Sequence, residues 1–284
     1  MLELPFNPPI QQIYLAEFNK INVFIKRDDM LHPFVSGNKW RKLKYVLQDA
    51  MQQEQTHLVS FGGAYSNHLV ALACAGAMYN FKTTAFVRGE AVSNHMLSLC
   101  KLYGMELIFV SRQNYLNKQV LYDDFATKNP KTYFIDEGGK GPLAAKGCTH
   151  ILDDVTNITH TVCAVGTGTT LAGLAQAAKQ KNIIAEGVCV LKGAEQMDDE
   201  IAELAGYKVK IHHQFNAGGY AKTTPELMGF IKYFAANTGI LLDQVYTAKM
   251  MFAIQQLAIQ NYYPDGSNVL AIHTGGLLGM ITTL

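Results

Sequence analysis

Short runs of β-branched and aromatic residues alternate with longer amphipathic stretches along most of the chain. The runs NVFIK, HLVSF, TTAFV, ELIFV and TYFID lie in the first half, and HTVCAV, IIAEGVCVL and NVLAIH lie in the second. Each of them except the last is followed by residues with helical spacing. Strands that alternate with helices are typical of βαβ units around parallel sheets. The pattern therefore predicts an α/β protein.

The helix expected from about Asn38 has a clear apolar stripe. This stripe consists of Trp40, Leu43, Leu47 and Ala50. The basic residues Arg41, Lys42 and Lys44 point towards its other faces. Most lysines on a helix keep one face in water, so the charges alone do not indicate chemistry.

The composition narrows the class of protein. With 284 residues, 49% of them hydrophobic, the chain can bury a large core and is not expected to be disordered. The net charge of +1 argues against nucleic acid and an anionic membrane as main partners. The sequence shows no secretory signal and no apolar run near the roughly 20 residues of a membrane span. Five widely spaced cysteines without a CxxC pair fit free thiols in a cytoplasmic protein, and no spacing predicts a metal site.

The segment CAVGTGTTLAG, residues 163–173, has the form of an anion-binding loop. An apolar strand leads into Gly166, Thr167, Gly168, Thr169 and Thr170, and a helix follows. Glycines let several N–H groups converge, and the helix adds the positive end of its dipole. A phosphate is the expected ligand; a tight turn with threonine caps is the alternative.

The spacing of this loop argues against the common nucleotide motifs. Gly166-x-Gly168 followed by Gly173 lacks the third glycine of the dinucleotide fingerprint GxGxxG. Leu174 stands where a P-loop requires its lysine. A small phosphate carried by a group other than a nucleotide remains the expected ligand of this loop.

The segment SFGGAYSNHLVALACAG, residues 60–76, is a second strand that ends in glycines before a helix. Ser66, Asn67 and His68 stand at the start of that helix. Ser66 or Asn67 is expected to cap it, and together with free N–H groups these side chains could equally bind a carboxylate.

Two further segments place polar residues at the start of a helix or at the end of a strand. LLDQVYTAKMMFAI, residues 241–254, places Tyr246 and Thr247 at a helix start, and NVLAIHTGGLLGM, residues 268–280, ends a strand in His273 and Thr274. A single tyrosine at a helix start is more often packed than catalytic.

Lys39 is the lysine best placed for covalent chemistry. A free lysine has a pKa of about 10.4, so only about one in a few thousand is neutral near pH 7. Burial or cationic neighbours lower that pKa. Lys39 follows Gly37 and Asn38 at a helix start, with Arg41 and Lys42 nearby. We expect this context to favour a neutral, nucleophilic amine.

Taken together, these motifs resemble those of a known family. RDDMLHPFVSGNKWRKLKY, FGGAYSNHLVALA, VGTGTTLAG, LDQVYTAKM and HTGGL occur in the order found in the pyridoxal-phosphate enzymes that include D-cysteine desulfhydrase and 1-aminocyclopropane-1-carboxylate (ACC) deaminase. The resemblance covers roughly residues 25–279. It implies a tryptophan-synthase-β-like fold (fold type II) of two three-layer αβα domains with the cofactor between them. Residues 1–45 and 155–284 would form the larger, cofactor-binding domain, and residues 46–154 the smaller one.

The resemblance also implies roles for individual residues. Lys39 would be the Schiff-base lysine, and Asn67 would contact the phenolic oxygen of pyridoxal 5'-phosphate. Ser66 and His68 would lie by the substrate carboxylate. The phosphate would be held by Gly166, Thr167, Gly168, Thr169 and Thr170, with help from Asn38 and Lys42. Tyr246 and Tyr220 would be active-site tyrosines, and Thr274, or else Thr247, would meet the pyridine nitrogen.

Two reactions follow from this resemblance. The first is the β-elimination of D-cysteine to pyruvate, ammonia and sulfide; the second is the conversion of ACC to 2-oxobutyrate and ammonia. ACC deaminases typically read Ser-Asn-Gln and Tyr-Glu where this chain has Ser66-Asn67-His68 and Tyr246-Thr247. Both differences favour the desulfhydrase and mark His68 and Thr247 as substrate-binding candidates.

Two other functions stay open at the level of sequence. One is a nucleotide-binding α/β enzyme that uses residues 163–173, and the other is a cofactor-binding protein without turnover. A small amino acid is the expected substrate. Because two-fold assemblies are the commonest and suit the family, we expect a homodimer.

Overall fold

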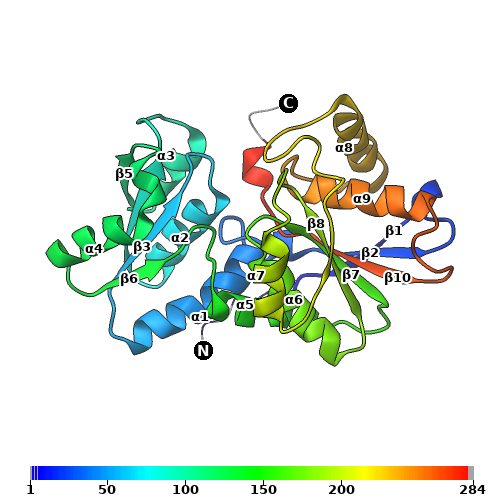
Figure 1. Ribbon diagram of the computed structural model, residues 1–284, viewed down its shortest axis with the longest axis horizontal. Helices are drawn as coiled ribbons and strands as arrows, with labels where there is room; N and C mark the ends of the chain where they lie inside the picture. Colours follow the sequence, from blue (N-terminus) through cyan, green and yellow to red (C-terminus); the bar gives the residue numbers. More distant parts are fainter. Residues whose placement is uncertain (1, 3, 5, 281–284) are drawn as a thin grey trace.

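The computed structural model describes residues 2, 4 and 6–280. The predicted domain ranges 1–45 and 155–284 also include residues 1, 3, 5 and 281–284, which lie outside the described part. Within it, the chain forms two separate β-sheets that lie side by side, each with helices on both faces (Figure 1). The predicted α/β architecture of two three-layer halves is confirmed.

The larger sheet is built from both ends of the chain. Its strands are, in spatial order, β1 (Ile10–Ile13), β2 (Asn22–Lys26), β10 (Asn268–Ile272), β7 (His160–Val165), β8 (Ile184–Cys189) and β9 (Lys210–His212). All neighbours are parallel except β1, which pairs with β2 in the antiparallel direction. The last strand of the chain therefore lies near the middle of this sheet.

Helices cover both faces of the larger sheet. One core joins it to α8 (Pro225–Thr238) and α9 (Thr247–Ile259), and another joins it to α6 (Thr169–Gln180) and α7 (Met197–Ala205). Strands buried on both faces need near-continuous apolar sequence. In β10, the run VLAI from Val269 to Ile272 is apolar and buried, and so meets that requirement.

The smaller sheet is entirely parallel. Its strands, in spatial order, are β5 (Glu106–Val110), β4 (Lys82–Arg88), β3 (His57–Gly62) and β6 (Thr132–Ile135). One face packs on α1 (Asn38–Gln52), α2 (Asn67–Met78) and α3 (His95–Leu102), and aromatic residues fill the space between the other face and α4 (Lys118–Lys128). The expected apolar stripe of α1, which includes Trp40 and Leu43, belongs to this core. Since α1 runs unbroken through residue 45, the predicted domain boundary there stays a prediction.

Helix α5 (Pro142–Thr149) lies at the junction of the two halves, between α1 and α6 (Figure 1). Two glycines make these crossings possible. A Cβ on Gly147 would lie 1.8 Å from the carbonyl oxygen of Arg41, and one on Gly173 would lie 2.1 Å from that of Ala145. Gly173, which ends the glycine-rich segment, therefore serves helix packing. None of the helices in the described part combines the length and the apolar character that a bilayer crossing requires.

The close crossing of α5 and α6 predicts that a methyl group added at Gly173 destabilises the protein, whereas one added at an open helix position does not. We expect Gly173→Ala to lower the free energy of unfolding by about 1–3 kcal/mol, because the new Cβ would overlap backbone that has no room to move. Urea unfolding would measure the change. Gly229→Ala in α8, where no atom lies within 4 Å of the added Cβ, is the matched control. It should be neutral or slightly stabilising, since alanine is the better helix former; equal losses in both variants would contradict the packing argument.

Candidate active site

A cavity of about 1260 Å³ opens between the two halves. It is lined by loops that follow the carboxyl ends of strands in both sheets, together with the start of α1. Ligands of open α/β sheets bind at such strand ends. The cavity is therefore the candidate active site.

Most of the residues predicted from sequence line this cavity. They are Asn38, Lys39, Lys42, Ser66, Asn67, His68, Gly166, Thr167, Gly168, Thr170, Tyr220, Tyr246 and Thr274. Two predicted residues do not line it. Thr169 is fully buried in the first turn of α6, and Thr247 is fully buried in the first turn of α9. The Thr247 hydroxyl donates to the carboxylate of Asp243 at 2.7 Å, so in this structure it faces the protein interior.

Backbone contact with the end of β10 fixes the segment that carries Lys39. Gly37 has a φ of +59°, and a Cβ on it would lie 2.0 Å from the carbonyl oxygen of Thr274. Only glycine fits this conformation and this approach. As a result, the first residues of α1 and Thr274, which come from opposite ends of the chain, line the same cavity.

Burial, together with the positive charge of Lys42, lowers the pKa of Lys39 to about 7. A substantial fraction of this amine is therefore neutral at physiological pH, as a nucleophile requires. The prediction that the charge of Arg41 also lowers the Lys39 pKa was wrong. Its guanidinium forms a two-point ion pair with the buried Asp28, at 3.0 and 3.2 Å, which neutralises its charge.

The glycine-rich loop connects β7 to the N-terminus of α6. Gly168 is the N-terminal cap of the helix, with a φ of +78°. The Asn38 amide donates to the Thr170 hydroxyl at 2.8 Å, and the Lys42 ammonium donates to the Thr167 hydroxyl at 3.2 Å. Within the described residues, the buried hydroxyl of Thr169 has no hydrogen-bond partner. Free amide groups of the first helical turn, hydroxyls and an ammonium together form a suitable cradle for a phosphate.

The start of α2 presents a second set of polar groups. Ser66 is its N-cap and accepts a hydrogen bond from the Leu69 amide at 3.3 Å, as expected. Asn67 is partly exposed and lines the cavity. The amide groups of this turn and these two side chains can bind a carboxylate.

His68 is neutral and has a defined tautomer. Burial and the charges of Lys39 and Lys42 hold its pKa well below the ordinary value. Its Nε2 lies 2.9 Å from the Ser60 hydroxyl, whose only proton is donated to the Ile135 carbonyl at 2.8 Å. Nε2 must therefore carry the histidine proton. The Nδ1 lone pair is buried and has no partner within the described residues, so it can accept a hydrogen bond from a ligand.

The two predicted tyrosines line the cavity and contact each other. The rings of Tyr220 and Tyr246 meet edge to face, with centroids 6.1 Å apart. Burial and the neighbouring Tyr220 hold the pKa of Tyr246 well above its usual value, so this phenol stays protonated. The buried ammonium of Lys249 donates to the carbonyls of Asn216 and Gly219 at 2.8 and 2.7 Å, which holds the loop that carries Tyr220.

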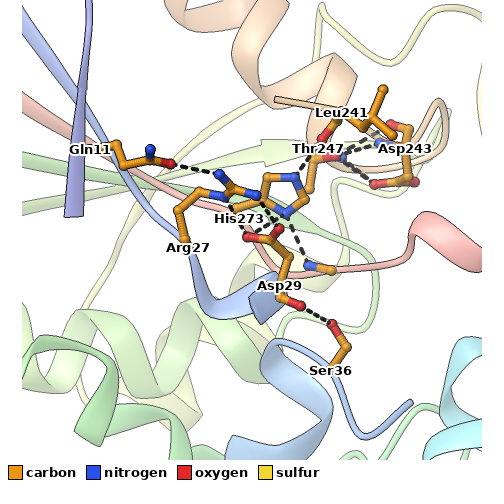
Figure 2. A network of polar contacts seen from close by, with 9 residues as sticks. Gln11, Arg27, Asp29, Ser36, Leu241, Asp243, Thr247 and His273 are labelled. Atoms are coloured by element: carbon orange, nitrogen blue, oxygen red, sulfur yellow. Dashed lines mark hydrogen bonds and ion pairs between the residues drawn. The ribbon is translucent and has the colours of Figure 1, made fainter. Parts of the chain in front are cut away.

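A network behind the cavity was not foreseen from sequence (Figure 2). Arg27 binds both carboxylate oxygens of Asp29, at 2.9 and 2.8 Å, and Asp29 also lines the cavity. Nδ1 of His273 accepts from the Gly275 amide at 3.3 Å, so Nε2 is the nitrogen that donates to the Leu241 carbonyl, 2.7 Å away. The RDD and HTGG motifs were visible signals, but which partners they have depends on the tertiary fold.

Asp243 is a second residue missed from sequence (Figure 2). Its carboxylate accepts hydrogen bonds from the amides of Val245, Tyr246 and Thr247 at 2.8–2.9 Å. The carboxylate thus caps the N-terminus of α9 and fixes the backbone of Tyr246. An aspartate before a helix in LDQVYT was the available signal.

An α/β protein of two halves, with a partly neutral lysine beside a phosphate cradle, has the construction of an enzyme that binds a phosphorylated aldehyde cofactor through its lysine. The family model described as "Pyridoxal-phosphate dependent enzyme" matches residues 5–275. The chain belongs to that family. Its fold type II architecture and its cofactor, pyridoxal phosphate, are confirmed.

Individual relatives carry two different names. A Thermotoga maritima protein named "Putative 1-aminocyclopropane-1-carboxylate deaminase" is 32% identical, over 98% of this chain and 97% of its own length. The D-cysteine desulfhydrase of Yersinia pestis is 27% identical, over 92% of this chain and 88% of its own. A crystal structure of an "ACC deaminase homologue" superposes with a TM-score of 0.83 at 27% identity, covering 98% of this chain and 91% of that one.

The lowered pKa of Lys39 predicts how the apoprotein captures its cofactor. The neutral amine is the reactive form, and its fraction is small below the pKa and large above it. We expect the rate of covalent capture to rise with pH, with a midpoint near the Lys39 pKa of about 7. Borohydride reduction at timed intervals, with mass spectrometry of the Lys39 peptide, would measure it. Lys39→Ala is the control for labelling elsewhere, and a midpoint near 10.4, the value of a free lysine, would contradict the assignment.

Proposed function

We propose that this protein is a lyase that eliminates the β-substituent of a small amino acid, with D-cysteine as its first candidate substrate. The observation that supports this most directly is the partly neutral amine of Lys39 in the cavity. Elimination begins with loss of the proton on Cα, and an amine with a pKa of about 7 is suited to remove it near neutral pH. The products would be pyruvate, ammonia and sulfide.

The roles of the other residues follow from their positions. When bound, pyridoxal phosphate supplies an electron sink for the charge that develops at Cα. The N-terminus of α2, with Ser66 and Asn67, would bind the substrate carboxylate. The neutral Nδ1 of His68 would accept a hydrogen bond from the ligand.

The remaining polar groups would serve the cofactor and the leaving group. Asn38, Lys42 and the loop from Gly166 to Thr170 would hold the phosphate. Thr274 would lie at the ring nitrogen, where a hydroxyl stabilises charge less than a carboxylate would and so favours prompt elimination. Tyr246, which stays protonated, would donate a proton to the departing group.

ACC deamination is the second candidate function, giving 2-oxobutyrate and ammonia. It is supported by the name of the Thermotoga maritima relative and by the pair of tyrosines at the cavity. ACC has no proton on its α-carbon, so a base there cannot start the reaction. The assembly as a homodimer and the cytoplasmic location stay predictions.

Keto-acid release from D-cysteine and from ACC by the cofactor-loaded protein would separate the two functions. We expect pyruvate with one equivalent of sulfide from D-cysteine, and little 2-oxobutyrate from ACC. Lactate dehydrogenase coupling and a sulfide assay would measure the products. 2-Oxobutyrate formed at a higher kcat/KM than pyruvate would contradict the first candidate and support the second.

Replacing Lys39 tests its role in either reaction. We expect Lys39→Ala to lower kcat by at least about 10²-fold, the typical contribution of a positioned base. The variant should keep its fold, since Gly37 still fixes the segment. Circular dichroism and the unfolding midpoint are the controls, and full turnover by Lys39→Ala would overturn the assignment.

A further inference from the structure

Two arginines line the cavity and have no role in the proposed reaction. Arg88 is the last residue of β4, and Arg112 follows the end of β5 by two residues. Arg88 is the register partner of Val110, the last residue of β5. Both side chains are exposed, and both leave the same edge of the smaller sheet from neighbouring strands.

The charges around these arginines are unbalanced. Among the described residues, neither Arg88 nor Arg112 has a carboxylate partner, whereas both acidic residues that line the cavity do have basic ones. Asp29 binds Arg27 at 2.8 Å, and Glu137 shares Lys118 with Asp136, each carboxylate lying 3.1 Å from the ammonium. Within the described part of the chain, both arginines therefore line the cavity without an ion-pair partner of their own. Paired arginines bind phosphate, sulfonate and carboxylate groups through bidentate hydrogen bonds.

Arg88 lies close to the loop that we assign to the substrate. Its Nη2 atom is 3.9 Å from the position of a Cβ on Gly63, three residues before Ser66. Its guanidinium also lies over the ring of the buried Tyr115, 5.5 Å from the centroid, which limits its freedom. A ligand held at the start of α2 can thus present its far end to Arg88.

We infer that Arg88 and Arg112 bind an anionic group at the end of the substrate side chain. The inference rests on the proposed elimination and names its substrate class: a small amino acid with a negatively charged β-substituent. Lys39 takes the Cα proton, and the bond from Cβ to the substituent breaks with its electron pair leaving on the substituent. For a phosphate ester of serine, the substrate and one water give pyruvate, ammonia and inorganic phosphate.

Two substrates that differ in the charge of the β-substituent test this inference. O-Phosphoserine carries an anion and β-chloroalanine does not, and the D and L forms of both would be used. In the cofactor-loaded wild type we expect a higher kcat/KM for one enantiomer of O-phosphoserine than for β-chloroalanine. Arg88→Gln should lower the ratio of these two values by about 10- to 100-fold, mainly through KM, as expected for a lost hydrogen bond between charged groups.

Two further variants and a change in salt concentration control this experiment. Arg112→Gln should lower the same ratio, and Lys101→Gln, an exposed residue of α3 outside the cavity, should not change it. Added salt should raise KM for O-phosphoserine more than for β-chloroalanine. Equal losses for both substrates in Arg88→Gln, or no loss for either, would overturn the inference.

Binding without turnover separates this inference from the proposed reaction. Calorimetry with Lys39→Ala protein would compare O-phosphoserine with serine of the same chirality. Tighter binding of the phosphorylated form that is lost on adding Arg88→Gln supports the anion site even if no substrate is turned over. Equal affinity for the two amino acids would overturn the anion site even if D-cysteine is a good substrate.

Discussion

The approach of Gly37 to Thr274 is the contact on which the site depends. No side chain fits at residue 37, because its Cβ would lie 2.0 Å from a carbonyl oxygen. The start of α1 is therefore docked directly on the end of β10, a strand that lies between β2 and β7. The position of Lys39 is thus set by the backbone of the larger sheet. Substitution of side chains around the cavity would therefore leave the backbone of Lys39 in place.

The second general feature of the cavity is an excess of basic over acidic side chains along its walls. Lys39, Lys42, Arg88 and Arg112 all line it, and its acidic residues are paired with basic ones. Burial lowers the pKa of Lys39 and of Lys42, which limits the repulsion between them. The N-termini of α2 and α6 add their dipoles on either side. Such a cavity is electrostatically complementary to ligands that carry several negative groups.

Local patterns predicted most of the elements, although not β1, whose sequence IQQI is short and half polar. They did not predict the distant contacts. The start of α1 at Asn38, the cap of α2 at Ser66 and the loop before α6 followed from propensity and turn chemistry. The pairing of Arg41 with Asp28, 13 residues apart, could not be inferred, nor could the inward direction of Thr247. The neighbourhood of Arg88 and Arg112 depends on strand register, which the periodicity of either strand alone does not contain.

Lys42 also contacts the smaller half, since its ammonium donates to the carbonyl of Gly138 at 3.0 Å as well as to Thr167. Gly138 follows β6 of one sheet and Thr167 follows β7 of the other. One buried cation therefore joins loops from both sheets at the place where the phosphate would bind. A ligand held there stabilises the association of the two halves by mass action. A cofactor bound there would in that sense be a structural component as well, because its phosphate would join loops that belong to different sheets.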